Sequence, residues 1–128
     1  MPMHIHSASA AVADQDASLA FYVDTLGWEK AADAPIAGDM RWVTVVPPGS
    51  TTQLALPDIR WFDGGVAPSK NTGISIVTTD IDADYATWSD RGVRFKGPVE
   101  TMPWGDKATW FYDIDDNEFY LIEEVAAG

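Results

Sequence analysis

Cysteine is absent from the 128 residues, and the two histidines stand close together near the start, at positions 4 and 6. Without cysteine the chain has no disulfide, no thiolate metal ligand and no thiol nucleophile. No apolar run approaches the roughly 20 residues that cross a bilayer, and no basic region followed by an apolar stretch marks a secretory signal. We therefore expect a cytoplasmic protein.

Basic residues are also few: 8 Lys and Arg stand against 20 Asp and Glu, which gives a formal net charge of −12. A field of this sign repels phosphate backbones and anionic lipid headgroups, so we expect no nucleic-acid partner and no membrane partner. Hydrophobic residues make up 46% of the chain, which is typical of a globular domain with a packed core.

The two halves of the chain resemble each other at a separation of about 67 residues. The clearest match pairs residues 16–24 (DASLAFYVD) with residues 82–90 (DADYATWSD). Two further matches are RWV at 41–43 with TWF at 109–111, and QLAL at 53–56 with YLIE at 120–123. Three matches in the same order indicate an internal duplication.

Each half is interpreted as a βαβββ module, because alternating β-branched residues predict strands and an aspartate N-cap and a closing glycine bracket a helix. In the first half we expect strands at 4–12, 28–32, 41–46 and 51–56, turns at 35–38 and 47–50, and a helix from Asp14 or Asp16 to Gly27. In the second half we expect strands at 73–78, 93–95, 110–114 and 119–123, a turn at 115–117, and a helix from Asp80 or Asp82 to Gly92. The predicted fold is α+β, in a single domain 1–128 made of a first module 1–56, a linker 57–72 and a second module 73–128.

Four segments carry a family resemblance: VADQDASLAFYVDTLGW at 12–28, DIDA at 80–83, RGVRFKGP at 91–98 and FYDIDDNEFYLIE at 111–123. Together with the repeat, they make the chain resemble the vicinal oxygen chelate (VOC) superfamily of glyoxalases, bleomycin resistance proteins and dioxygenases. The last segment departs from the family's D-P-D-G-N turn, since Ile114 replaces Pro and Asp116 replaces Gly.

This resemblance implies the glyoxalase/bleomycin resistance fold, in which two βαβββ modules form a curved, barrel-like mixed sheet with helices on the outside. It also implies a homodimer. It does not select one function, because the fold carries lyases, isomerases, dioxygenases, thiol transferases and non-catalytic antibiotic binders.

Enzymes of this superfamily hold a divalent metal with one side chain from each of four strands. The resemblance places these four ligands at Ser7, Gln53, Gly73 and Tyr120. Ser, Gly and Tyr do not make an ordinary Zn, Ni, Fe or Mn site, so we expect no metal and no cofactor. His4 and His6 alternate away from the cavity if Ser7 faces it, although binding of a metal by this pair stays open.

Residues two apart on a strand share a face, so the four mapped positions set the phase of a concave face that we expect to hold a ligand. Val43, Val45 and Phe111 then point toward the helices, and Trp104 lies on a loop at the rim. The expected ligand-binding residues are large rings with a few polar groups: Ser7, Trp42, Gln53, Ser75, Trp104, Trp110, Tyr112 and Tyr120.

The other tryptophans are expected to have different roles. Trp28 and Trp88 are predicted to belong to the core. Trp61 and Phe62 are predicted to be exposed on the linker, where they form a dimer contact or a lid.

A pocket of rings and hydrogen-bonding groups suits a planar organic ligand. We predict metal-independent binding and sequestration of a small aromatic molecule, as in antibiotic resistance, and no catalysis. Three alternatives stay open. They are a metal-dependent lyase, isomerase or dioxygenase with other ligands, a metal-free enzyme with Tyr112 or Tyr120 as general acid, and an accessory domain without a ligand.

Overall fold

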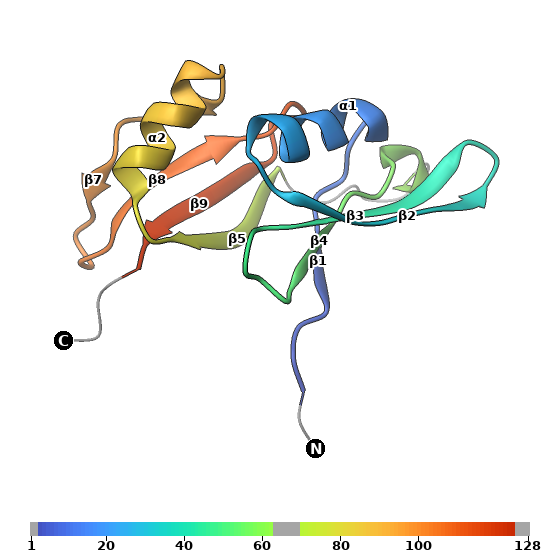
Figure 1. Ribbon diagram of the computed structural model, residues 1–128, viewed down its shortest axis with the longest axis horizontal. Coiled ribbons are helices and arrows are strands. Elements are labelled where there is room, and N and C mark those ends of the chain that lie inside the picture. The colour runs from blue at the N-terminus through green and yellow to red at the C-terminus, as the bar shows by residue number, and fades with distance from the viewer. Residues whose placement is uncertain (1–2, 63–69, 125–128) are drawn as a thin grey trace. The chain divides into compact units, whose positions relative to one another are not determined.

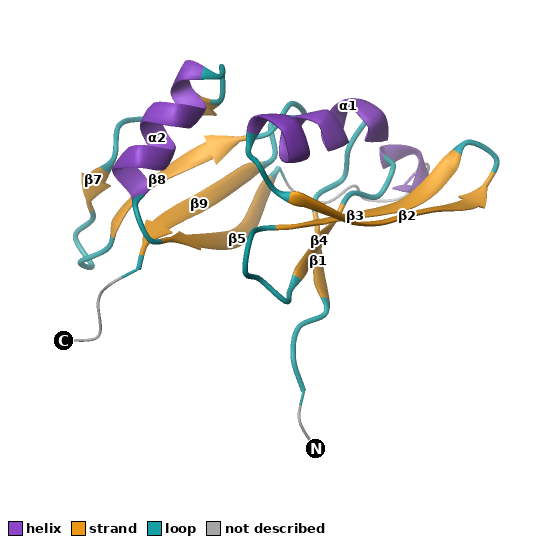
Figure 2. Cartoon of the chain, viewed as in Figure 1, coloured by secondary structure: helices purple, strands orange, loops and turns teal. Residues whose placement is uncertain are grey.

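The computed structural model describes residues 3–62 and 70–124, and the chain divides into two compact units, Met1–Lys70 and Asn71–Gly128. Each unit packs helical segments on its own sheet, so the predicted α+β class is confirmed (Figures 1 and 2). Most of the predicted linker, residues 63–69, lies outside the described residues. Among the described residues, no helix is long and apolar enough to span a membrane.

The first unit has a sheet with strand order β1-β4-β3-β2. Its strands are β1 (Ser7–Ser9), β2 (Glu29–Ala37), β3 (Met40–Val46) and β4 (Gln53–Ala55). Strands β1 and β4 pair in parallel, whereas β3 pairs antiparallel with both β2 and β4. Its helical segments are α1 (Gln15–Leu19), the π-helical η1 (Ala20–Thr25) that continues it, and the 3₁₀ turn η2 (Ile59–Phe62).

The second unit repeats this topology with strand order β5-β9-β8-β6, and β7 pairs separately with β8. Its elements are β5 (Asn71–Thr78), α2 (Ile81–Asp90), β6 (Arg94–Phe95), β7 (Glu100–Thr101), β8 (Lys107–Tyr112) and β9 (Glu118–Glu123). Strand β5 is parallel to β9, and the other pairs are antiparallel. The same strand order in both units agrees with the duplication inferred from the sequence.

The two main helices begin in the same way, as the sequence predicts. Asp14 and Asp80 are the N-caps, and each side chain accepts a hydrogen bond at 3.1 Å from a backbone N–H three residues later. The alternative N-cap candidates, Asp16 and Asp82, lie inside the first turn of each helix. Their carboxylates there interact favourably with the helix dipole.

Each unit has its own aromatic core beneath its helix. In the first unit the ring of Tyr22 lies 5.4 Å from Trp28, which is 4% exposed. In the second unit Trp88 of α2, 6% exposed, meets Phe111 of β8 at 5.2 Å, and Phe111 stacks on Phe119 of β9 at 5.3 Å. These contacts confirm Trp28 and Trp88 as core residues and place Phe111 on the helix side of the sheet, as predicted.

Several predicted boundaries are wrong. The turn expected at 35–38 is mostly strand, because β2 extends to Ala37 and turns only at Gly38 and Asp39. Pro35 is tolerated there because β2 is the edge of its sheet, where a missing N–H breaks no ladder bond. Strand β7 was not expected, and β8 begins at Lys107 and ends at Tyr112, earlier than the predicted 110–114.

The linker aromatics also differ from expectation. Trp61 and Phe62 are half-buried in η2 and not fully exposed. This turn is fixed to the first unit by the backbone, since Ile59 N–H donates to the carbonyl of Val12 at 2.8 Å.

Candidate functional site

The face of the second unit's sheet that lies opposite α2 carries a row of aromatic rings. Phe111, Phe119 and Leu121 are buried on the side of α2, so the alternating residues Trp110 and Tyr120 lie on the opposite face. The register places Tyr120 beside Trp110 on one strand and beside Ser75 on the other. Three of the predicted binding residues therefore lie side by side across β8, β9 and β5.

A third ring joins this row from a loop. Trp104 lies between β7 and β8 and is 62% exposed. Its ring centroid is 6.4 Å from that of Tyr120, and the Tyr120 ring is 4.8 Å from Trp110. We call Trp104, Trp110 and Tyr120 the aromatic cluster. The structure confirms that Trp104 lies on a loop, as predicted.

Polar atoms of the cluster converge on one carboxylate. The indole N–H of Trp104 is shared between Tyr120 Oη and Asp106 Oδ2, each at 3.0 Å. The Tyr120 hydroxyl in turn donates to Asp106 Oδ2 at 3.4 Å. Asp106 was not among the predicted site residues, because nothing in its local sequence distinguishes it from the other exposed acids.

The Tyr120 phenol remains protonated at neutral pH. Burial raises its pKa above the ordinary value, the nearby Asp106 carboxylate raises it further, and the hydrogen bond from Trp104 opposes both. A phenol with this shift is a hydrogen-bond donor and a poor general acid or base at neutral pH. The raised pKa and the engagement of the hydroxyl by Asp106 therefore both disfavour the alternative in which Tyr120 performs proton transfer.

Cations lie beside Trp110 and beside Tyr112, another predicted ring of this face. Lys96 Nζ lies 5.4 Å from the centre of the Trp110 ring, and the Arg94 guanidinium lies 5.5 Å from the centre of the Tyr112 ring. Both cations are ion-paired. Lys96 pairs with Glu118 at 3.2 Å, and Arg94 pairs with Asp116, in the turn between β8 and β9, at 2.6 Å. A cavity of about 190 Å³ opens beside Trp110, lined by Lys96, Gly97, Pro98, Glu100, Met102, Thr109 and Trp110.

The remaining predicted binding residues belong to the first unit. Ser7 of β1 and Gln53 of β4 are register partners on neighbouring strands. The hydroxyl of Thr44 donates to Gln53 Oε1 at 2.7 Å, so these two side chains share a face. Trp42, two residues before Thr44 on β3 and half-buried, shares that face as well. The prediction that Ser7, Trp42 and Gln53 share one face agrees with this arrangement.

The four positions mapped as metal ligands do not fit a divalent cation. The Gln53 oxygen already accepts from Thr44, and Tyr120 is a phenol and not a phenolate. Gly73 has no side chain and lies at a register irregularity with a φ of 70°, so Ser75, and not Gly73, pairs with Tyr120. Among the described residues, no group of three or more His, Cys, Asp or Glu side chains is placed to hold a metal ion.

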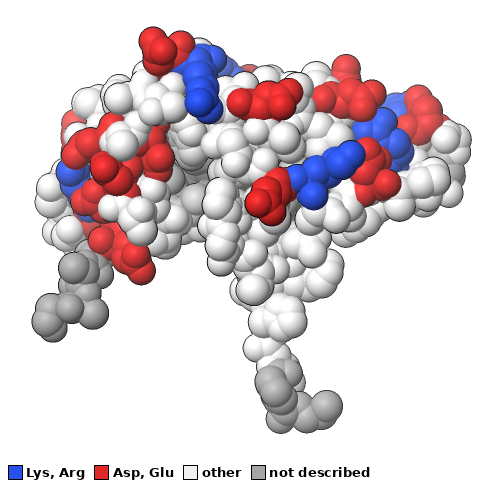
Figure 3. Space-filling model, in the orientation of Figure 1, with Lys and Arg blue, Asp and Glu red and all other residues white. Residues whose placement is uncertain are grey.

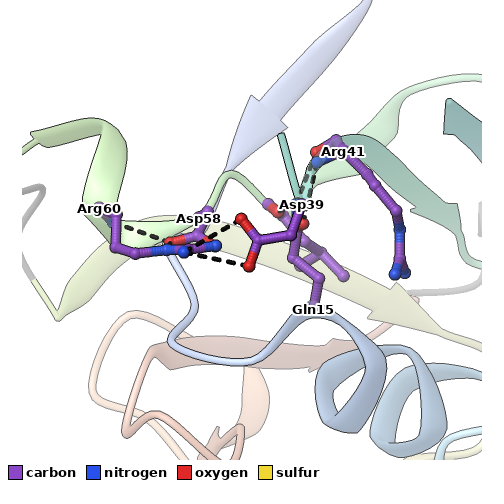
Figure 4. A network of polar contacts seen from close by, with 6 residues as sticks. Gln15, Asp39, Arg41, Asp58 and Arg60 are labelled. Carbon is purple, nitrogen blue, oxygen red and sulfur yellow. Dashed lines mark hydrogen bonds and ion pairs between the residues drawn. The ribbon is translucent and has the colours of Figure 1, made fainter. Parts of the chain in front are cut away.

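A larger cavity, of about 490 Å³, lies in the first unit and has a polar lining (Figure 4). Arg60 is paired with Asp58 at 2.6 Å and with Asp39 at 3.2 Å, and the dashed lines in Figure 4 mark these contacts. Arg41 is likewise paired, with Asp16 at 2.8 Å and with the Asp33 carboxylate at 2.9 Å.

Both arginines that line this cavity are therefore ion-paired, and aspartates outnumber them in its lining. On the face shown in Figure 3, Lys and Arg side chains likewise lie beside Asp and Glu. Apart from the local pair of Asp58 and Arg60, the network joins residues far apart in the chain, so the sequence contained no signal for it. Its role is structural: Gln15 is buried and donates from Nε2 to the carbonyls of Arg41 at 2.7 Å and Leu56 at 2.9 Å.

Known proteins resemble the whole of this architecture. Residues 4–121 match the family profile of the Glyoxalase/Bleomycin resistance protein/Dioxygenase superfamily. An α+β chain of two βαβββ units with this match belongs to that superfamily, and the resemblance inferred from the sequence is confirmed.

Three relatives illustrate the match. The uncharacterized protein YetH of Bacillus subtilis is 29% identical over 123 residues, covering 96% of this chain and 100% of YetH. A superfamily member from Sphaerobacter thermophilus has a solved structure with 51% identity and a TM-score of 0.88, covering 96% of this chain and 98% of its own. TnmS3, an antibiotic binding protein from Streptomyces sp. CB03234, is 35% identical with a TM-score of 0.82, covering 97% of this chain and 98% of its own.

Proposed function

We propose that this protein binds and sequesters a small, planar aromatic molecule without a metal ion. The observation that carries the proposal is the aromatic cluster, in which Trp110 and Tyr120 lie 4.8 Å apart on the sheet face opposite α2, with Trp104 beside them. Rings in this arrangement offer stacking surface to a flat ligand. Ser75, in register with Tyr120, adds a hydroxyl that would orient the ligand.

The name of a relative supports the same class of function. TnmS3, 35% identical over nearly the whole chain, is called an antibiotic binding protein. We therefore place antibiotic-like molecules within the proposed ligand class, and sequestration as the mode of action. Buried ring area would stabilise the complex by roughly 25 cal/mol per Å², from which the cost of association is subtracted.

The donor chemistry supports independence from metal. Ser7, Gln53, Gly73 and Tyr120 supply a hydroxyl, an engaged amide oxygen, no side chain and a protonated phenol. Divalent transition metals prefer imidazole, thiolate and carboxylate ligands. We keep Ser7, Trp42, Gln53 and Tyr112 in the proposed binding set. We also propose that the protein acts in the cytoplasm as a homodimer. Sedimentation equilibrium will measure its molecular mass in solution and thereby test the dimer.

Quenching of tryptophan fluorescence by acridine, 1-naphthol and indole, after removal of divalent ions with EDTA, tests this proposal. We expect saturable quenching by at least one probe, and at least a tenfold loss of affinity in Trp110→Ala, because its ring packs against Tyr120 in the centre of the cluster. The control is Tyr85→Phe, whose ring packs on Phe95 of the second unit, outside the cluster.

Two outcomes contradict the proposal. Equal affinities of wild type and Trp110→Ala would remove the aromatic cluster from the site. Binding that disappears with EDTA and returns with a divalent ion would favour the metal-dependent enzyme instead.

A further inference from the structure

The position of Trp104 depends on polar contacts and not on burial. Its side chain is the exposed member of the aromatic cluster, at 62%, so little apolar packing holds it in place. The indole N–H contacts to Tyr120 Oη and Asp106 Oδ2, both at 3.0 Å, are what hold the ring over Tyr120.

The present spacing of Trp104 and Tyr120 excludes a ligand from between them. Atoms in van der Waals contact lie about 3.5–4.0 Å apart, so a planar ring inserted between two others needs them nearly parallel and about 7–8 Å apart. The centroids are 6.4 Å apart and the planes are inclined at 52°. A ligand can stack on both rings only after Trp104 moves.

The loop that carries Trp104 is closed by its own backbone. Met102 N–H donates to the carbonyl of Asp106 at 2.7 Å, and Gly105 N–H donates to the carbonyl of Met102 at 2.9 Å. Gly105 has a φ of 104°, a conformation that residues with a Cβ rarely adopt. With the backbone held in this turn, the motion left to Trp104 is rotation of its side chain.

Asp106 joins the two rings, because a single oxygen of its half-buried carboxylate accepts from both Trp104 and Tyr120. We infer that Asp106 is a positioning residue that latches Trp104 over Tyr120, and that ligand entry requires this latch to open. The ligand step rests on the proposed function. Closure lowers the population that is competent to bind, so loosening the latch should speed association.

The latch itself is tested in the free protein by NMR of the six tryptophan indole N–H groups. Trp104→Phe, which removes one signal, assigns the Trp104 resonance. We expect Asp106→Ala to shift this resonance and to speed its exchange with solvent at least tenfold. Asp106→Asn should show an exchange rate between those of wild type and Asp106→Ala, since its amide oxygen can still accept a hydrogen bond from the indole. The control, Asp90→Ala, removes an exposed carboxylate at the end of α2 and should leave the resonance unchanged.

The entry step is tested by stopped-flow binding of acridine. We expect Asp106→Ala to associate at least threefold faster than wild type, and the Trp104 indole resonance of the wild-type protein to shift on binding. An unchanged resonance in free Asp106→Ala overturns the positioning role. Acridine binding that leaves the wild-type Trp104 resonance in place overturns the latch, while the proposed function stands. If no probe binds, the proposed function and the entry step fail together, and the NMR of the free protein still decides whether Asp106 positions Trp104.

Discussion

At the scale of single residues, the same side-chain type has different chemistry in different surroundings. Asp39 is mostly exposed, whereas Asp58 is 3% exposed, and both contact the Arg60 guanidinium. Hydrogen bonds from Arg60 lower the pKa of the Asp58 carboxyl below its ordinary value of 3.8, against the opposing effect of burial. Folding is thus linked to the ionisation of Asp58.

We predict that Asp58→Asn lowers the free energy of unfolding at neutral pH by about 1 kcal/mol, a small value because Arg60 is half exposed. Since the pKa of Asp58 is lowered on folding, its contribution is complete above the unfolded value of 3.8 and is lost as pH falls through the folded value. The difference in free energy of unfolding between wild type and Asp58→Asn should therefore become smaller below about pH 4. Urea denaturation at neutral and acidic pH measures it.

The control for this experiment is Asp39→Asn, which alters the exposed partner of the same arginine. We expect this variant to change stability little. A difference between Asp58→Asn and wild type that stays constant down to the lowest pH would contradict the assigned linkage.

At the scale of elements, the two units bury the first residue of their main helices with different chemistry. The first residue of α1 is Gln15 and the first residue of α2 is Ile81, and both are buried directly after an aspartate N-cap. Ile81 packs as a fully buried apolar side chain. Gln15 instead connects the start of the helix to the carbonyls of Arg41 and Leu56 and accepts from the Arg41 N–H at 3.2 Å.

We predict that Gln15→Ala lowers the free energy of unfolding by about 2 kcal/mol, because one buried and one partly buried carbonyl lose their donor. Thermal and urea denaturation measure this loss. The adjacent Asp16→Asn, which removes an exposed contact to Arg41, is the matched control and should have a small effect. Equal effects of the two substitutions would show that the Gln15 hydrogen bonds are not what joins α1 to its sheet.

At the scale of the whole molecule, charge sets which ligands approach fastest. The net charge of −12 attracts cations and repels anions over distances of about one Debye length. We predict that a cationic acridine derivative associates faster than an anionic derivative of the same ring system, and that high salt narrows the difference. Stopped-flow fluorescence at low and high ionic strength measures both rates. A rate ratio independent of salt would contradict electrostatic steering.

Much of the fold was predictable because it depends on local and periodic features. The repeated DASLAFYVD and DADYATWSD segments predicted two helices in equivalent places and limited each N-cap to two aspartates, of which the structure selects Asp14 and Asp80. Alternation along β8 and β9 predicted that Trp110 and Tyr120 lie opposite Phe111. The edge position that admits Pro35 was not predictable, since it depends on which strands become neighbours.

The sequence by itself narrowed each helix start to two aspartates and indicated the strand faces, because both features depend on residue type at a fixed spacing along the backbone. The tertiary structure decided what happens between distant segments. It brought Trp104 and Asp106 against Tyr120, paired Ser75 with Tyr120, and joined Arg60 to Asp39. Such contacts depend on loop paths and strand register, which a short stretch of sequence does not encode.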